Sequence, residues 1–216
     1  MKIHPYPQGS AEWMMARAGI PTASEFGNLV TPKWKARDGQ MPRTYLAEKL
    51  AEWWLGGPLP GFGTWSTEQG QVLEQESLPW FELETGRQVV RPGFVTTDDG
   101  RIGCSPDGII DQDTGLEVKC LEPTNHVKLL LTGDISDYLA QIHGGMLVTG
   151  FSKWVFLSYR RGFPNLVIEI ERNEEIQSIL RDALDLWLAD FEAGKARLEE
   201  INGGPSRRTA STPAGS

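Results

Sequence analysis

The residues with the most evident chemistry form the stretch CSPDGIIDQDTGLEVKC at positions 104–120. Its last letters, LEVKC, alternate apolar and polar residues, as in a β-strand whose successive side chains point to opposite faces. Glu117 and Lys119 then share one face. A hairpin turn at 111–115 would fold this strand back on the preceding segment and bring Asp107 next to Glu117. The sequence therefore predicts two carboxylates and an ammonium group at one place.

Two carboxylates about 4 Å apart repel each other by roughly 4 kcal/mol at an effective dielectric constant near 20. Such a pair needs a proton or a cation, and Mg²⁺ or Mn²⁺ prefers hard oxygen ligands of this kind. The backbone carbonyl of Val118 would offer another oxygen, and Lys119 would orient or deprotonate a water molecule. A metal at this position would also stabilise charge on a phosphate, so the set suits phosphodiester hydrolysis.

Each part of this pattern also has an ordinary interpretation. A Glu-x-Lys sequence is usually the solvent face of an amphipathic strand, and Pro-Asp-Gly is a common turn sequence. The combination of Asp107 with Glu117 and Lys119 at hairpin spacing is much more specific than either part.

The pattern Pro106-Asp107, a ten-residue step and then Glu117-Val118-Lys119 resembles the PD-(D/E)xK nuclease signature. The longer string Cys-Ser-Pro-Asp-Gly…Leu-Glu-Val-Lys-Cys is similar to the lambda-type alkaline exonucleases, the nucleases of phage recombination. The similarity covers about residues 10–195. It includes these further motifs, in the order of the family: Trp13…Arg17-x-Gly-Ile-Pro-Thr-Ala-Ser-Glu, Gly70-x-x-x-Glu74 and Tyr138-x-x-Gln141.

This resemblance implies a role for each matching residue. Asp107 and Glu117 resemble the carboxylates that bind metal, and Lys119 resembles the catalytic lysine. Glu74 resembles the acidic residue that a preceding helix sends into the site, where it would join the metal ligands. Gln141 resembles the glutamine that completes the edge of the active site. Without the motif, a plain surface position on an acidic helix is the preferred interpretation of Glu74. From spacing alone, Gln141 fits a helix-surface amide about as well as a site residue.

The resemblance also implies that Arg17 and Ser24 hold a terminal 5′-phosphate. The residues support this independently, because Thr22 and Glu25 form a capping-box pattern that would open a helix with Ser24 in its first turn. Free amides and the helix dipole there favour an anion, and arginine can contact phosphate through two nitrogens. The alternative is that Ser24 merely assists the cap.

The segment 31–43 (TPKWKARDGQMPR) is basic and rich in helix-breaking residues, so we expect a loop that meets DNA. Lys35 and Arg37 are candidate backbone contacts, and Trp34 is a candidate wedge between bases. The alternative is a set of solvated charges without a specific role.

The chain has 216 residues and a net charge of −8, which at first argues against a nucleic-acid partner. The charge is uneven, however. Residues 169–200 hold ten acidic and four basic residues, whereas residues 1–50 hold seven basic and four acidic ones. A local basic surface is therefore compatible with the composition.

The hydrophobic pattern indicates a chain with both helices and strands, and the resemblance implies an α/β fold in which a mixed central β-sheet is flanked by helices, as in the PD-(D/E)xK core. We expect one nuclease domain over residues 1–201, with an N-terminal helical part at about 10–60 that grips the DNA end and a catalytic core at about 64–200. Residues 202–216 should be disordered. The expected helices are 10–19, 22–30, 44–55, 66–85, 123–131, 137–149 and 173–198, and the expected strands are 88–96, 101–105, 108–111, 115–121, 153–159 and 166–171. The segment 56–63 should be a loop.

By resemblance, the activity is Mg²⁺-dependent 5′→3′ digestion of one strand of linear double-stranded DNA, releasing 5′-mononucleotides and leaving a 3′ overhang. Mn²⁺ is a candidate substitute, with two ions in each site. The family works as a toroidal homotrimer together with a single-strand annealing protein. A cytoplasmic protein without a membrane span is expected, because the start has no secretory pattern and two cysteines form no disulfide framework. The rival functions are a PD-(D/E)xK endonuclease and a non-catalytic protein that binds DNA ends.

Overall fold

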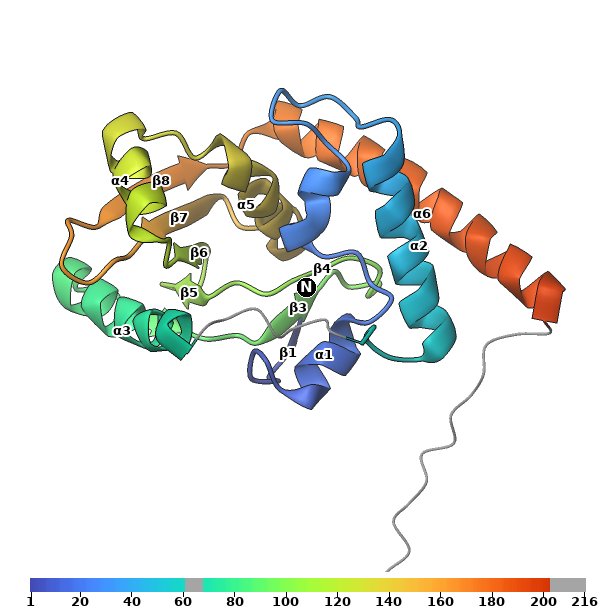
Figure 1. Cartoon of the computed structure of the whole chain (residues 1–216), viewed down its shortest axis with the longest axis horizontal. Helices are drawn as coiled ribbons and strands as arrows, with labels where there is room; N and C mark the ends of the chain where they lie inside the picture. The colour runs from blue at the N-terminus through green and yellow to red at the C-terminus, as the bar shows by residue number, and fades with distance from the viewer. Residues whose placement is uncertain (61–67, 203–216) are drawn as a thin grey trace, which may run out of the picture.

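Two β-sheets and the helices around them make up the described part of the computed structural model, residues 1–60 and 68–202 (Figure 1). The larger sheet has the strand order β2-β5-β6-β7-β8. Its strands are β2 (Val89–Val90), β5 (Gly108–Ile110), β6 (Thr114–Lys119), β7 (Lys153–Ser158) and β8 (Leu166–Glu171). The smaller sheet, β1-β3-β4, consists of β1 (Lys2–His4), β3 (Phe94–Thr96) and β4 (Gly103–Cys104).

The larger sheet is mixed, as predicted. β6 and β7 pair in parallel, whereas the other neighbouring strands pair antiparallel. A parallel pair needs a crossover connection. Here the crossover contains α4 (Pro123–Thr132) and α5 (Ser136–Thr149).

Alternation along the central strands divides the core between the two faces of the larger sheet. Leu116 and Val118 of β6 pack in one cluster with Leu73 and Phe81 of α3 (Glu68–Thr85). The opposite face forms a second cluster with α4 and α5, built from residues that include Leu129, Ile142, Met146, Trp154 and Phe156. β6 is therefore buried on both faces, and its Glu117 and Lys119 point to the α5 side.

A third cluster joins elements that lie far apart in the chain. It brings together α2 (Gln40–Leu55), α6 (Glu174–Asn202), the short 3₁₀-helix η1 (Ala23–Asn28) and part of α5, through buried residues such as Phe26, Tyr45 and Leu184. In Figure 1, α6 runs beside α2 at the opposite end of the molecule from α3 and α4. The apolar stripe predicted for 173–198 provides this contact. α1 (Ala11–Arg17) lies next to the smaller sheet.

Several predicted boundaries were wrong. The helix expected at 44–55 begins at Gln40, so Pro42 lies in its first turn, where proline is tolerated. The helix expected at 22–30 is the 3₁₀-helix η1, and Thr22 makes no side-chain capping bond. The strand expected at 88–96 is two strands that belong to different sheets, and β1 was not expected.

Some expectations concern residues outside the described ranges. These are the end of the 56–63 loop, the start of the 66–85 helix and the disorder of the tail beyond Asn202. Within the described ranges, no helix combines the length and apolarity needed to cross a membrane.

Candidate active site

A β-hairpin places Asp107 beside β6, the strand that carries Glu117. Asp107 directly precedes β5, which pairs antiparallel with β6. Its backbone N–H donates to the Leu116 carbonyl at 3.0 Å, and its carboxylate Oδ2 accepts the Val118 N–H at 2.7 Å. The structure thus brings Asp107 to the middle of β6, as its spacing from Glu117 predicted.

Glu117, Lys119 and Gln141 form a closed triangle of polar contacts. The Lys119 ammonium lies 2.6 Å from Glu117 Oε1, and the Gln141 amide nitrogen donates to the same oxygen at 2.6 Å. Lys119 also donates to Gln141 Oε1 at 3.2 Å. Gln141 comes from α5, so the contact joins the helix to the strand. Its side chain faces the candidate site, not bulk solvent.

Burial and like charge disfavour ionisation of the two carboxyl groups. Burial raises the pKa of Asp107 well above its usual range, and the neighbouring Glu117 adds to the effect. Burial also raises the pKa of Glu117, although Lys119 and Gln141 oppose the shift. A nearby positive charge therefore stabilises the ionised pair, and the Lys119 ammonium supplies one. Burial alone would lower the pKa of Lys119, but the Glu117 and Asp107 carboxylates outweigh it and raise that pKa.

One hollow of about 710 Å³ is lined by all the residues with predicted catalytic or phosphate-binding roles. These are Arg17, Ser24, Glu74, Asp107, Glu117, Lys119 and Gln141, together with the backbone segment at Val118. A smaller hollow of about 360 Å³ also touches Glu74 and Asp107. Residues that lie up to 124 positions apart in the chain thus face one space, which is large enough to admit a charged ligand.

The donor chemistry of this hollow suits a hard dication. The carboxylates of Asp107 and Glu117 are oxygen ligands, and Glu74 lines the same space. Within the described ranges, no three His, Cys, Asp or Glu side chains lie close enough to form a complete ligand set. A metal here would hence keep several ligands from water or substrate, as Mg²⁺ commonly does.

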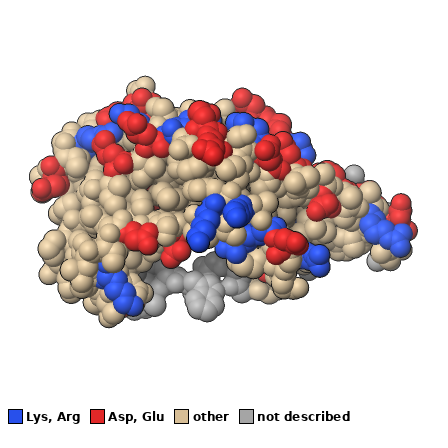
Figure 2. Space-filling view, turned by 90° about the horizontal axis from the view of Figure 1, so that it is seen from above, with Lys and Arg blue, Asp and Glu red and all other residues tan. Residues whose placement is uncertain are grey.

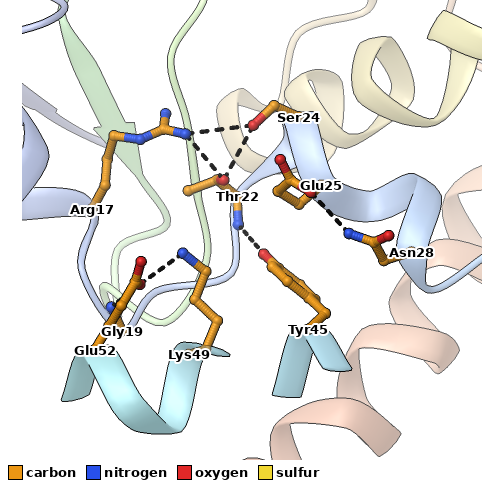
Figure 3. Close-up of polar contacts among 9 residues, drawn as sticks. All are labelled: Arg17, Gly19, Thr22, Ser24, Glu25, Asn28, Tyr45, Lys49 and Glu52. Carbon is orange, nitrogen blue, oxygen red and sulfur yellow. Dashed lines mark hydrogen bonds and ion pairs between the residues drawn. The ribbon is translucent and has the colours of Figure 1, made fainter. Parts of the chain in front are cut away.

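Arg17 and Ser24 meet at the edge of this hollow (Figure 3). Arg17 Nη2 lies 3.4 Å from the hydroxyls of both Thr22 and Ser24, and Arg17 Nη1 donates to Ser105 Oγ at 2.8 Å. The guanidinium group also lies 4.2 Å from the centre of the Trp13 ring. The expected pairing of Arg17 with Ser24 is thus present, but a six-residue 3₁₀-helix replaces the expected α-helix.

Ser105 is a site residue that the sequence reasoning missed. Its hydroxyl binds Arg17 and also accepts the Trp13 indole N–H at 3.0 Å. It stands two positions before Asp107, so it connects the arginine to the carboxylate site. Its place in the Cys-Ser-Pro-Asp string was the available signal. Gln8 also lines the hollow and donates to the Pro106 carbonyl at 3.0 Å, and nothing in its local sequence indicated this.

The candidate DNA contacts of the basic segment have different surroundings. Lys35 is exposed. Arg37 Nε donates to the Gly27 and Val30 carbonyls at 2.7 and 3.1 Å, which anchors the segment to the end of η1. Trp34 is not the exposed group that the sequence suggested. It is half-buried and packs edge-on against His143, with ring centres 5.5 Å apart. These three residues do not line the 710 Å³ hollow.

Comparison with known proteins places this geometry in a family. Residues 12–152 match the YqaJ-like viral recombinase domain, a range that includes every residue assigned to the hollow above except Gln8. No curated protein sequence matches the chain.

Three of the solved structures with a similar fold are described as exonucleases. An alkaline exonuclease from Laribacter hongkongensis, LHK-Exo, is 25% identical with a TM-score of 0.74, over 89% of this chain and all of that one. LHK-Exo in complex with dAMP gives 24% identity and a TM-score of 0.80, over 90% and 98% of the two chains. A phage-related exonuclease from Haemophilus somnus 129PT is 11% identical with a TM-score of 0.60, over 85% of this chain and 96% of that one. The chain therefore belongs to the family of YqaJ-like viral recombinase domains, with the fold of the lambda-type alkaline exonucleases.

Proposed function

We propose that this chain is a Mg²⁺-dependent 5′→3′ exonuclease. It would degrade one strand of linear double-stranded DNA to 5′-mononucleotides and leave a 3′ overhang for single-strand annealing. The family and the fold support the coarser statement that it is a nuclease of phage-type recombination. The observation that carries the finer proposal is the single hollow that joins the Asp107–Glu117–Lys119 group to Arg17 and Ser24.

Asp107 and Glu117 would hold the metal, with the Val118 carbonyl as a further oxygen ligand. Glu74 lines the same hollow and would join the ligands by moving toward the two carboxylates, and two ions are the expected number. When bound, Mg²⁺, or Mn²⁺ in its place, would lower the pKa of a water molecule and neutralise charge on the phosphate. The side chains fit this role because buried, mutually repelling carboxylates of raised pKa are stabilised by a cation.

The remaining steps belong to side chains of this chain. The Lys119 ammonium, which Glu117 and Gln141 hold in place, would donate a hydrogen bond to the attacking water or to a phosphate oxygen. Arg17 and Ser24 would bind the terminal 5′-phosphate, which fixes how far the strand enters the hollow. Binding of the end at one place and cleavage at another would give removal of nucleotides from the 5′ terminus.

The partners in this proposal are linear duplex DNA, two further copies of the chain in a toroidal homotrimer, and a single-strand annealing protein. Figure 2 shows Lys and Arg side chains gathered near the middle of one face, beside acidic side chains. Such a local cluster lets a chain of net charge −8 hold a polyanion. Lys35 remains a candidate DNA contact because its side chain is exposed.

A digest of linear duplex labelled at either the 5′ or the 3′ end of one strand tests the proposal. With Mg²⁺ we expect early release of the 5′ label as a mononucleotide, late release of the 3′ label, and no activity in Asp107→Asn. Cutting of a closed circular plasmid would favour the endonuclease alternative. DNA-end binding without any Mg²⁺-dependent digestion would favour the non-catalytic one.

The phosphate pocket has its own test. We expect the wild-type protein to have a higher kcat/KM on 5′-phosphorylated duplex than on 5′-hydroxyl duplex, because Arg17 and Ser24 bind the phosphate. The ratio of the two values should fall to one in Arg17→Ala. Equal values in the wild-type protein would contradict the pocket.

A further inference from the structure

The loop at residues 18–22, between α1 and η1, is fastened to α2 by two side chains (Figure 3). Glu52 Oε2 accepts the Gly19 N–H at 2.9 Å, and the Tyr45 hydroxyl accepts the Thr22 N–H at 3.1 Å. Both acceptors are buried on α2. The loop therefore depends on α2 for two of its backbone hydrogen bonds.

Both bonds are made by residues that lie between the two phosphate-pocket residues in the chain. Gly19 is two positions after Arg17, and Thr22 is two positions before Ser24. The Thr22 hydroxyl itself contacts both side chains, at 3.4 Å from Arg17 Nη2 and 3.3 Å from Ser24 Oγ. A shift of the loop would thus move the arginine and the serine relative to each other.

The acceptor for Gly19 is held in a buried ion pair. Lys49 lies 2.8 Å from Glu52, and their side chains are 5% and 2% exposed. A buried ion pair contributes little net stability, because loss of hydration offsets the attraction between the charges. The pair does, however, fix the Glu52 carboxylate in one orientation, with Oε2 toward the Gly19 N–H.

Close packing adds to this restraint. Gly19 has a φ of +72°, and a Cβ built on it would lie 3.2 Å from Trp53 Cβ. The loop thus passes directly over α2 in a backbone conformation that favours glycine. Side-chain hydrogen bonds and backbone contact together define its position.

We infer that Tyr45 and Glu52, with Lys49 orienting Glu52, are positioning residues that set the geometry of the Arg17–Ser24 pocket for one terminal phosphate. This inference rests on the proposed function and assigns α2 a role in recognising the DNA end. The positioning residues touch the loop, and Arg17 and Ser24 touch the phosphate.

Tyr45→Phe tests the inference because it removes one hydroxyl and keeps the ring. We expect the KM for 5′-phosphorylated duplex to rise roughly three- to tenfold, the effect of losing one hydrogen bond. The preference for phosphorylated over hydroxyl ends should fall toward one. Thr149→Val is the matched control. It removes a buried hydroxyl that accepts the Phe151 N–H at the end of α5, and should leave the preference unchanged.

A second comparison isolates the bond to Gly19. Lys49→Met/Glu52→Gln keeps an acceptor oxygen for the Gly19 N–H without a buried charge, whereas Lys49→Met/Glu52→Leu removes it. We expect the Gln variant to retain the end preference and the Leu variant to lose it, with thermal melting to show that both are folded. Equal preference in the two variants would contradict the role of Glu52.

The outcomes separate this inference from the proposed function. If Arg17→Ala loses the preference while Tyr45→Phe and the Leu variant keep it, the pocket stands and the positioning role is wrong. If the wild-type protein shows no preference, both are wrong. Loss of preference in Arg17→Ala, Tyr45→Phe and the Leu variant, with Thr149→Val unchanged, supports both.

Discussion

The Lys119 ammonium contacts the two oxygens that define its position, one from Glu117 and one from Gln141. It also lies 5.6 Å from the centre of the Tyr138 ring. These contacts hold the positive charge of Lys119 at one position at the edge of the hollow. The lysine can therefore stabilise charge on a phosphate without losing side-chain freedom during the reaction.

Lys119→Ala should reduce cleavage by about 10²-fold or more, because it removes the ammonium group that the proposed mechanism places against the reacting phosphate. Binding of linear duplex in Ca²⁺ should persist, since Arg17 and the carboxylates remain. Rates of mononucleotide release and gel-shift titrations check the two parts. Lys153→Ala is the control, because Lys153 is an exposed lysine on the neighbouring strand β7. Retained hydrolysis in Lys119→Ala would remove this lysine from the mechanism.

Local spacing was sufficient to predict only part of the candidate site. Asp107, Glu117 and Lys119 lie on one hairpin, so strand alternation and a turn bring them together without knowledge of the rest of the fold. Gln141 and Arg17 reach the same hollow from other elements, and the resemblance to a family was needed to select them.

The capping box failed for a physical reason. The Thr22 hydroxyl contacts Arg17 and Ser24, and the Glu25 carboxylate accepts from Asn28 at 2.8 Å. The groups that would cap a helix thus have other partners nearby in the chain, so the capping box does not form. The Thr22 N–H itself is bound to Tyr45, which no local pattern could indicate.

At the scale of elements, the position of α5 relative to the larger sheet depends on Trp154 of β7. A Cβ at Gly115 of β6 would come within 2.2 Å of this ring, and a Cβ at Gly145 of α5 within 2.3 Å. The indole therefore fills the space between strand and helix, and the two glycines leave room for it. This contact sets the distance from which Gln141 reaches Glu117.

Gly145→Ala should lower the free energy of unfolding by about 1–3 kcal/mol, because its methyl group would overlap Trp154 in a packed core. Urea denaturation measures the change. Gly27→Ala is the control, since a Cβ there meets no described atom within 4 Å. An unchanged urea midpoint for Gly145→Ala would show that α5 can shift away from Trp154, and would contradict a fixed position of this helix.

α5 also carries a buried histidine that should make stability depend on pH. Burial lowers the pKa of His143 to about 4, with Arg172 adding to the effect, and Trp34 packs against its ring. Its Nδ1 has no hydrogen-bond partner among the described residues. The neutral form is therefore the one that the folded protein accommodates.

The pKa of His143 is near 6.5 in the unfolded chain and about 4 in the folded protein, so the unfolded chain binds the proton more readily. The free energy of unfolding should therefore be highest above pH 6.5 and fall as the pH drops toward 4. The loss attributable to His143 is on the order of 3 kcal/mol at most. His143→Gln has no imidazole to protonate. As the pH falls from 6.5 to 4, the difference in unfolding free energy between this variant and the wild-type protein should therefore shift in favour of the variant. Parallel curves for the two proteins would contradict the assignment.

Element boundaries were the less predictable part of the fold. The segment 88–96 reads as one strand, but Pro92 and Gly93 interrupt it, and its halves join different sheets. β1 is three residues long and carries no alternating pattern of its own. Its pairing with β3, at a distance of about ninety positions, depends on the assembled fold.

On the scale of the whole molecule, η1 and α2 share one core with α6, and the hollow is lined by residues of η1 as well as of the larger sheet. α6 and α2 pack with η1, and η1 carries Ser24. α3 and the hairpin contribute Glu74 and Asp107 from the other side. The fold class was predictable because the alternation of strand and helix patterns requires a crossover between parallel strands.

If the proposed toroid forms, light scattering should give a mass of three chains of 24.0 kDa each. A ring that encloses duplex DNA should also digest many nucleotides before release, which a challenge with unlabelled duplex would measure. A mass of one chain together with release after each cleavage would exclude the enclosing trimer and leave the chemistry of the single subunit in place.

The two-sided burial of β6 has a consequence for how this strand tolerates change. Substitutions at Leu116 and Val118 disturb the packing under α3 and should appear in melting curves, whereas those at Glu117 and Lys119 should appear in turnover. A saturation scan over residues 116–119 would then give two interleaved profiles with a period of two residues, one for folding and one for catalysis. Variation that retunes the chemistry can thus accumulate on one face while the other keeps the protein folded.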